Sequence, residues 1–422
     1  MHERLSFTSK LGLGELSTVE RQLCDVFLRG DVLDLRAKDQ EKDDPERGKE
    51  WGKERQVRAE IIVALLLSAV KPDPGRVAML WLAGARVIGD LSLAYAEVTS
   101  PLLLVDCCFD EPICLDEAAT RSVHLTGSSI PRLDANDSKI KGHLTLERCR
   151  VQSIALTDVH IAGQLNFNGA RLTNPNGDAL SADRLVVEGG MFCREGFQAQ
   201  GAVRLPGARV AGQLNLNGAR LTNPNGDALS ADRLVVEGGM FCREGFQAQG
   251  EVRLLGARVA GQLDFSGARL TNPKRDALNA DQLVVEGSMF CREGFQTEGT
   301  VRLPAVRIAQ LDFSGARLTN PNGDALNADQ LVVEGSMFCR EGFQAQGEVR
   351  LLGARVAGQL DFSGARLTNP KRDTLSADGL VVGGDIFCRE GFQAQGEVRL
   401  LGARVAGQLD FSGARLTNPK RD

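Results

Sequence analysis

Residues Gly169–Gly201 read GARLTNPNGDALSADRLVVEGGMFCREGFQAQG, and Gly218–Gly250 repeat them without change. Edited copies follow. A Gln-Leu pair marks the same point of each copy, at Gln164, Gln213, Gln262, Gln310, Gln359 and Gln408. The interval from Gln262 to Gln310 is shorter than the others because RIAQLDF at Arg307 lacks one glycine of the neighbouring RVAGQLDF. Because self-similarity at a fixed period is the signature of stacked repeats, the chain is expected to fold as a solenoid.

Apolar residues inside each repeat come in pairs two apart, such as Val252 and Leu254. A period of two puts both members of a pair on one face of a short strand. The pairs follow one another too closely for hairpins of ordinary strands. Before the repeats, every fourth pair begins at nearly constant intervals, at Leu80, Leu102, Val123, Leu144 and Leu165. We therefore expect four-sided coils of about 21–26 residues, with two coils in each repeat.

The extra residues of a repeat lie mostly in TNPNGD or TNPKRD. Asn-Pro followed by Asn-Gly is strong turn chemistry. We therefore expect a loop that protrudes from alternate coils.

The segments GARVA, GARLT and GARVI resemble the pentapeptide-repeat family, whose unit has a small residue, a variable residue and a large aliphatic residue or Phe. The resemblance covers about Leu80 to the C-terminus and implies an all-β solenoid, a right-handed quadrilateral parallel β-helix. The chain also resembles bacterial proteins described as membrane-associated oxidoreductases, which implies a redox activity. The alternative fold is a three-sided parallel β-helix, against which the fourfold sub-period argues.

Residues 1–75 lack this rhythm and are expected to form a helical N-terminal cap. Ser17 and Glu20 have the spacing of a capping box, which predicts a helix over STVERQLCDVFLRG. A second helix fits GKERQVRAEIIVALLLSAV, before Pro72, and would cover the first coil. The charge-dense connector between them, RAKDQEKDDPERGKEWGKER, is expected to be a solvated loop.

The remainder divides into irregular coils at 76–164 and tandem repeats at 165–422, of which the last is incomplete. The formal net charge of −5 gives no reason to expect nucleic-acid binding. MHERLSFTSK does not resemble a signal peptide, and the apolar run Ala59–Val70 is too short to span a bilayer. These features predict a cytoplasmic protein; contact of the second helix with a membrane surface is the disfavoured alternative.

The residues give no pattern for a catalytic, cofactor-binding or metal site. The four histidines are His2, His124, His143 and His160, and none has a catalytic arrangement around it in the sequence. Three cysteines lie close together in the sequence, at Cys107, Cys108 and Cys114. They lack the CxxC spacing of a metal site, so a structural role is expected for them. No cofactor is therefore predicted.

One cysteine recurs in a Phe-Cys-Arg triplet in every repeat, at Cys193, Cys242, Cys291, Cys339 and Cys388. Neighbours two coils apart would be about 10 Å from one another, beyond the reach of a disulfide. We expect these cysteines to be inward-facing thiols.

Two outward-facing rows are candidates for binding a partner. One is aromatic, provided that Met and Cys of the MFC segment face inward; the opposite register would bury the Phe instead. The aromatic row is Phe192, Phe241, Phe290, Phe338 and Phe387. The basic row is Arg209, Arg258, Arg307, Arg355 and Arg404. A further arginine file runs through Arg220, Arg269, Arg317, Arg366 and Arg415, and acidic residues recur beside these files, so solvated ion pairs are the simplest interpretation of the arginines.

Verbatim copying favours a surface of repeated contacts over a single active site. The predicted function is a non-enzymatic β-helical scaffold, a rod that binds an unknown protein partner. One alternative is a redox enzyme with its site in the irregular N-terminal half. The other is a DNA mimic that binds a topoisomerase, as the family resemblance implies.

The chain ends at GARLTNPKRD, within a repeat. An open solenoid end exposes strand edges and core residues. We therefore expect one of two arrangements. Either two copies associate end to end through this edge, or the natural chain continues beyond Asp422.

Overall fold

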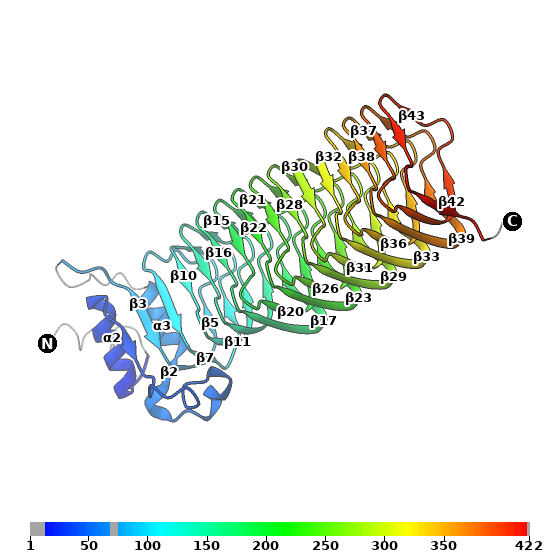
Figure 1. The fold of residues 1–422 in the computed structure, drawn as a ribbon. Helices are drawn as coiled ribbons and strands as arrows, with labels where there is room; N and C mark the ends of the chain where they lie inside the picture. The colour runs from blue at the N-terminus through cyan, green and yellow to red at the C-terminus, as the bar shows by residue number, and fades with distance from the viewer. Residues whose placement is uncertain (1–12, 68–74, 420–422) are drawn as a thin grey trace. The chain divides into compact units, whose positions relative to one another are not determined.

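The computed structural model describes residues 13–67 and 75–419 and shows a parallel β-solenoid, as the sequence predicts (Figure 1). It divides into two compact units, Met1–Gln200 and Gly201–Asp422. In both units the strands belong to two sheets, here named sheet A and sheet B. Every strand pairing described for either unit is parallel, because each strand lies beside the equivalent strand of the next coil.

Unit 1 begins with helical elements. Helix α2 (Thr18–Arg29) has the predicted capping box, in which Ser17 and Glu20 each accept a hydrogen bond from the other's backbone N–H. Gly30 ends it in the left-handed conformation. The second predicted helix is shorter than expected: η2 (Lys53–Arg55) and strand β2 (Gln56–Arg58) precede α3 (Ala59–Leu67), and the rest of the predicted segment lies outside the described residues. The 3-10 helix η1 (Pro45–Glu50) lies in the connector before it. Helix α3 packs against β2, β3 (Leu80–Ala83) and β5 (Leu91–Ser92), and thus covers the first coil.

The strands of unit 1 are short and follow the coils. Those of sheet A are β1 (Leu33–Asp34), β3 (Leu80–Ala83), β6 (Leu102–Val105), β9 (Ala119–Thr120), β10 (Val123–His124), β12 (Lys139–Ile140), β13 (Leu144–Thr145), β15 (His160–Ile161), β16 (Leu165–Asn166), β18 (Val186–Val187) and β19 (Met191–Phe192). Those of sheet B are β2 (Gln56–Arg58), β4 (Arg86–Ile88), β5 (Leu91–Ser92), β7 (Cys108–Phe109), β8 (Ile113–Cys114), β11 (Ser129–Asp134), β14 (Arg150–Ala155) and β17 (Arg171–Ser181). Strand β20 (Gln198–Arg204) crosses the division between the units.

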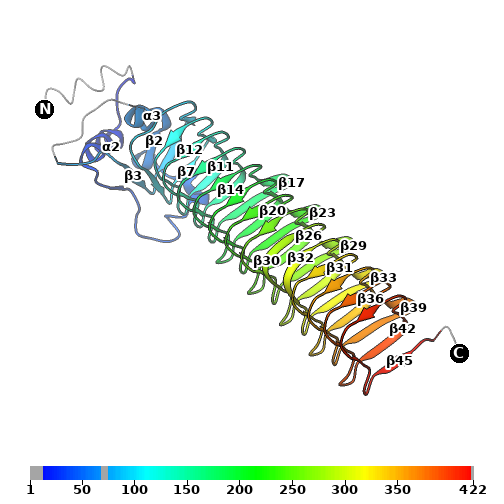
Figure 2. The ribbon, with the colours of Figure 1, turned by 90° about the horizontal axis from the view of Figure 1, so that it is seen from above.

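Unit 2 repeats one pattern of strands. Its sheet A contains β21 (Arg209–Val210), β22 (Leu214–Asn215), β24 (Val235–Val236), β25 (Met240–Phe241), β27 (Arg258–Val259), β28 (Leu263–Asp264), β30 (Val284–Phe290), β32 (Arg307–Asp312), β34 (Val332–Val333), β35 (Met337–Phe338), β37 (Arg355–Val356), β38 (Leu360–Asp361), β40 (Val381–Val382), β41 (Ile386–Phe387), β43 (Arg404–Val405) and β44 (Leu409–Asp410). Its sheet B contains β23 (Arg220–Ser230), β26 (Gln247–Arg253), β29 (Arg269–Asn279), β31 (Gln296–Arg302), β33 (Arg317–Asn327), β36 (Gln344–Arg350), β39 (Arg366–Ser376), β42 (Gln393–Arg399) and β45 (Arg415–Thr417). Figure 2 shows the long strands of sheet B stacked in sequence order.

The register between strands gives the length of each coil. Leu214 is paired with Met240, Met240 with Leu263, and Leu263 with Met289. The first and third of these steps along the chain are equal, and the second is shorter. A longer coil therefore alternates with a shorter one, and the two together span one sequence repeat. The prediction of two coils per repeat is confirmed.

The paired apolar residues form the core. Four pairs in one coil, which begin at Leu214, Ala219, Leu229 and Leu234, are almost completely buried. Phe265 and Phe295 from successive coils pack with ring centroids 6.2 Å apart. The apolar pairs face inward as predicted, but sheet B joins two of the four expected sides into one long strand.

The shorter interval at Arg307 changes one corner. Elsewhere a short strand such as β27 ends before the corner and β28 begins after it. Where the glycine is missing, β32 runs through the corner without a break, and so does its neighbour β30. The register shifts between Val285 and Ser288. The deletion is thus absorbed by straightening one corner, and the stack continues.

The prediction of a loop at TNPKRD is wrong in its form. These residues belong to strand β29, and the extra ones form a bulge between Thr271 and Asp276. Gly299 of the next coil lies against this bulge with φ +118°, and a Cβ there would be 2.4 Å from the carbonyl oxygen of Asn272. A glycine is required because the backbones approach so closely. The tip of the bulge is exposed, as predicted.

The N-terminal connector is largely exposed, as predicted, but part of it packs on unit 1. Trp51 is buried, and the guanidinium of Arg55 lies 3.6 Å from the centre of its ring. Arg55 also pairs with Asp43 at 2.9 Å, and Arg150 of the coils pairs with Asp44 at 3.0 Å. The acidic residues of the connector compensate arginines of unit 1, which charge density alone did not reveal.

Candidate interaction surfaces

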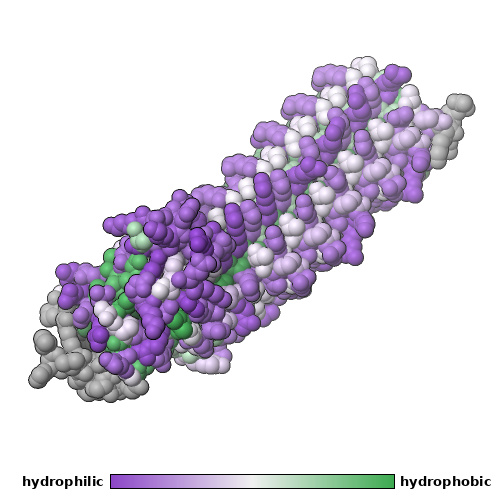
Figure 3. All heavy atoms as spheres, turned by 90° about the horizontal axis from the view of Figure 1, so that it is seen from below, coloured by the Kyte–Doolittle hydropathy of each residue, from purple (hydrophilic) through white to green (hydrophobic). Residues whose placement is uncertain are grey.

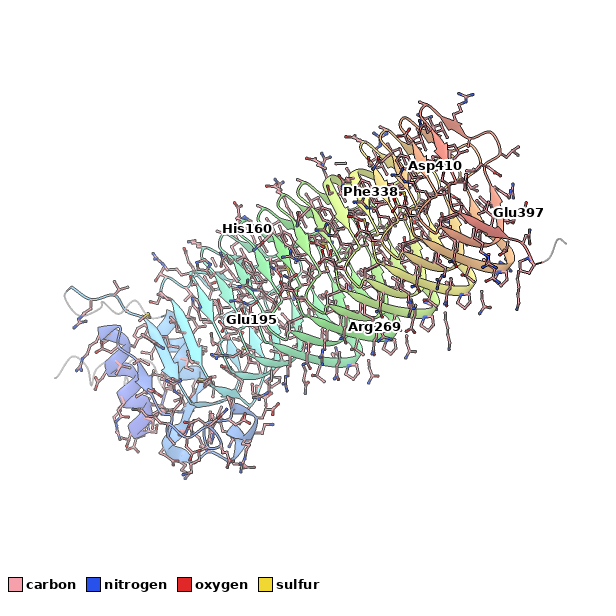
Figure 4. The ribbon with its side chains drawn as sticks, in the orientation of Figure 1. His160, Glu195, Arg269, Phe338, Glu397 and Asp410 are labelled. Carbon is pink, nitrogen blue, oxygen red and sulfur yellow. The ribbon has the colours of Figure 1, made fainter. Side chains whose placement is uncertain are left out.

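The MFC segment has the register in which Met and Cys face inward. Met289 and Cys291 are fully buried, whereas Phe290 between them is half-buried and faces outward. The same alternation holds for the copies, so the aromatic row consists of Phe192 in unit 1 and of Phe241, Phe290, Phe338 and Phe387 in unit 2. Figure 4 labels Phe338 on the sheet A side of unit 2. The aromatic row therefore lies on sheet A.

An arginine of the same triplet covers each phenylalanine. The guanidinium carbon of Arg292 is 4.5 Å from the ring centre of Phe290, and the distance for Arg389 and Phe387 is 4.1 Å. Cation–π contacts of this kind favour a fixed guanidinium. The Nε atom is nevertheless buried without a hydrogen-bond partner in the described structure, for Arg194, Arg243, Arg292, Arg340 and Arg389 alike. Most of these Nε atoms face the following glutamate at a longer distance, as Arg292 faces Glu293 at 3.5 Å. The row thus presents guanidinium groups held between a ring and a carboxylate.

Carboxylates alternate with the phenylalanines along sheet A of unit 2. Asp264 lies in register between Phe241 and Phe290. It is only 4 % exposed, and its Oδ1 accepts a hydrogen bond of 2.9 Å from the backbone N–H of Ser266. Its Oδ2 is 3.6 Å from Nη1 of Arg243. A buried carboxylate needs such compensation, so these residues form one connected polar network.

The basic row lies along a second set of short strands of sheet A. Arg258 is in register between Val235 and Val284, so arginine and valine alternate from coil to coil. The arginines are exposed; Arg258 pairs with Glu286 at 2.5 Å, and Arg209 forms the equivalent pair with Glu237. The ion pairs expected from the sequence are therefore present in part of the row. Between the basic and aromatic rows runs a corner of stacked glycines, where a Cβ on Gly261 would be 2.8 Å from the carbonyl oxygen of Gly238.

The repeat cysteines are buried thiols, as predicted. Burial raises the pKa of these thiols, to about 12 for Cys388 and well above the ordinary value for Cys291 and Cys339. The thiolate needed for nucleophilic or redox chemistry is therefore disfavoured. Cys107 has the same character, because burial raises its pKa to about 12.

The histidines are engaged in local contacts. Nδ1 of His143 accepts a hydrogen bond of 3.0 Å from the backbone N–H of Gln164, and Nε2 of His160 is 2.9 Å from Glu188. Burial lowers the pKa of His124, and nearby His143 lowers it further. His2 lies outside the described residues. Within the described ranges, no group of three or more His, Cys, Asp and Glu side chains is arranged to hold a metal ion.

Sequence reasoning missed a charged cleft of about 790 Å³ in unit 1. The connector forms one wall, and Arg148, Arg150 and Arg171 come from the coils. Arg36 on the connector pairs with Asp34 and Asp106, each at 2.9 Å. Basic residues placed at coil intervals opposite an acidic connector were the signal that could have revealed it.

Sequence reasoning also missed a row of carboxylates on sheet B, next to the bulges. Asp227 is in register with Glu251, and Asp324 with Glu348. Desolvation raises the pKa of all four carboxyl groups, and so it does for Asp276. Arginines of the adjoining positions compensate them, as Arg302 does for Asp276 at 3.4 Å. The register across the bulge places these side chains, and the bulge could not be derived from the repeat period.

No family model matches the chain, and no curated protein and no solved structure matches it either. The pentapeptide-repeat and oxidoreductase resemblances therefore remain predictions, while the parallel β-solenoid stands on the structure itself. None of the helices in the described residues has the length and apolar character that crossing a bilayer requires.

Proposed function

We propose that this chain is a non-enzymatic, cytoplasmic scaffold that binds a protein partner along sheet A. The members of the aromatic row and of the basic row that lie in unit 2 form the contact surface. Register carries the proposal: successive coils place a Phe-Arg pair, then an Asp-Ser pair, at the same position of the sheet. The surface offers a partner several equivalent contacts, and linked contacts of this kind raise affinity without any new chemistry.

Cation-covered aromatic side chains suit a protein partner. Aromatic residues and arginine are enriched where protein interfaces carry most of their binding energy. Stacking on Phe290 limits the motion of the Arg292 side chain, so that less conformational entropy is lost when a partner binds. The rest of the Arg292 side chain is 40 % exposed, so its guanidinium group can contact a carbonyl or carboxylate oxygen of the partner.

The proposal is tested with the full chain as bait in an extract of its native host, followed by mass spectrometry. A captured protein counts as the partner when the variant F241L/F290L/F338L/F387L loses at least tenfold in affinity for it and a variant with four changed glutamines of sheet B, Q247A/Q296A/Q344A/Q393A, does not. Equal affinity of both variants would exclude sheet A as the binding surface.

Valency gives an independent check. Deletion of residues 214–262 joins Gln213 to Leu263 and removes one whole repeat while it preserves the coil register. A partner that uses equivalent contacts should bind the shortened chain more weakly. Unchanged affinity would show that a single local site is sufficient.

The two alternative functions make different predictions. A redox enzyme with a site in the irregular half should purify with a bound cofactor or show one on titration, and the charged cleft of unit 1 is where it would be sought. A topoisomerase-binding DNA mimic should capture that enzyme. The near balance of acidic and basic residues does not favour mimicry of DNA.

A further inference from the structure

Sheet B of unit 2 carries a regular pattern of exposed side chains that sheet A does not have. Arg269 is in register with Gln247 on one side and Gln296 on the other, and this alternation runs along the sheet from Arg220 to Arg366. Beside it a second row starts at Thr222 and alternates threonine with glutamine, or with glutamate at one position. Figure 4 labels Arg269 on this sheet, and Figure 3 shows hydrophilic rows repeated over the face seen from below.

This face has an excess of positive charge. Its rows and bulge tips present eight exposed basic residues, namely Arg220, Arg269, Lys274, Arg275, Arg317, Arg366, Lys371 and Arg372. The carboxylate within the same rows is Glu298, which pairs with Arg269 at 2.9 Å. Arg317 binds the neutral side chain of Gln344 at 2.9 Å. Arg220 and Arg366 make no ion pair or side-chain hydrogen bond in the described structure.

The other carboxylates of sheet B do not neutralise this surface. Asp227 is paired with Arg253 and Asp324 with Arg350, each at 3.7 Å beyond the bulge, while Glu251 and Glu348 bind Asn279 and Ser376. Arg220 and Arg366 are thus free to bind an external anion.

The spacing of the arginine row indicates the shape of that anion. An arginine recurs at every second coil, so neighbours are separated by twice the strand spacing, about 9.6 Å. A polyproline II helix has three residues per turn and a rise of about 3.1 Å, so every third side chain returns to the same side after about 9.3 Å. Over four arginines the two periods differ by about 1 Å in total, which long side chains accommodate.

Other chain conformations fit this row less well. In a β-strand every third residue points to the opposite face, and an α-helix has a pitch of about 5.4 Å, of which 9.6 Å is not a multiple. The rows contain no aromatic side chain on which the bases of a single-stranded nucleic acid could stack. Acidic unfolded segments populate polyproline II readily, and arginine binds carboxylates through two parallel hydrogen bonds.

We propose that sheet B of unit 2 is a second binding surface, for an acidic polypeptide segment in the polyproline II conformation with a carboxylate at every third residue. Arg220, Arg269, Arg317 and Arg366 bind its carboxylates, and the basic bulge tips flank the bound segment. This surface is independent of the one on sheet A.

The test uses the full chain and two fluorescent peptides of equal composition. One is (Glu-Pro-Gln)6; the other has the same residues with glutamates separated alternately by two and four positions. Anisotropy titrations at low salt should show the regular peptide binding at least tenfold more tightly, and more weakly as salt rises. Equal affinity of the two peptides, or no binding of either, would overturn the proposal.

Matched variants locate the surface. R220Q/R269Q/R317Q/R366Q should weaken binding of the regular peptide at least tenfold. R209Q/R258Q/R307Q/R355Q removes the same charge from sheet A and should change the affinity less than twofold. Equal losses in the two variants would show net-charge attraction and refute the assignment to sheet B. Tighter binding of duplex DNA or anionic vesicles than of the peptide would refute the partner class.

Discussion

Two threonines occupy inward positions that carry alanine in the other copies. Thr297 is 2 % exposed where the neighbouring repeats have Ala248 and Ala345, and Thr374 is fully buried where they have Ala277 and Ala325. Neither hydroxyl has a hydrogen-bond partner in the described structure. We predict that Thr297→Val and Thr374→Val each stabilise the protein.

The magnitude follows from the group that is removed. Leaving a buried hydroxyl without a partner costs about 1–3 kcal/mol, and valine replaces it with a methyl group of similar shape. Extra apolar burial adds up to about 0.8 kcal/mol per carbon, less any strain from imperfect packing. Each valine variant should therefore be about 1–3 kcal/mol more stable, and the two effects should add because the sites are several coils apart.

Urea unfolding measures the difference, with the midpoint rising while the slope stays constant. The repeats supply the control, because Ala345 lies at the position equivalent to Thr297. Ala345→Thr should be less stable than Ala345→Val by the same amount that separates Thr297 from Thr297→Val. A valine variant at Thr297 that is no more stable than the natural chain would refute the inward register or the absence of a partner for this hydroxyl.

Three further predictions test the register, the charges and the open edge. Leu263→Asp should destabilise by several kcal/mol, since it buries an unpaired charge, whereas Arg258→Asp at an exposed position should shift the melting temperature little; similar shifts would contradict the inward assignment. Glu348→Gln should stabilise the protein at pH 7 but not well below pH 4.5. The pKa of Glu348 is raised from 4.5 in the folded state, so its carboxyl group favours folding when protonated and opposes folding as the pH rises through the raised pKa. A gain in stability that is constant with pH would disprove this. A chain that ends at Asp422 should self-associate with concentration in sedimentation experiments, because Leu401 is 74 % exposed in its last coil; a monomer at every concentration would show that the edge is protected.

The sequence was sufficient to predict the coils because apolar pairs report the inward direction directly. Met289 and Cys291 illustrate the limit, since the residues alone allowed either them or Phe290 to face the core. The structure decides for Met and Cys because Leu263 and Leu311 of the adjacent coils are in register with Met289. This alignment depends on the length of every corner, which a single period does not specify.

The candidate surfaces were predictable in part for the same reason. Copying alone identified the aromatic and basic rows of sheet A. It could not show that Arg292 covers Phe290, because that contact depends on side-chain direction. Copying also could not show that TNPKRD is part of a strand and not a loop. These turn-forming residues stay in the strand because the next coil pairs with their backbone, and that pairing is not visible in the sequence.

Both proposals require equivalent side chains to recur at a constant distance along a sheet of unit 2. Pulsed electron–electron double resonance tests this directly by measuring the distance between two spin labels. One label is placed at Arg209 and the other at Arg307, Arg355 or Arg404. These pairs are four, six and eight coils apart, so the backbone separations should be about 19, 29 and 38 Å and increase linearly. Distances that do not grow by about 9.6 Å per repeat would contradict the stacked coils and both binding surfaces.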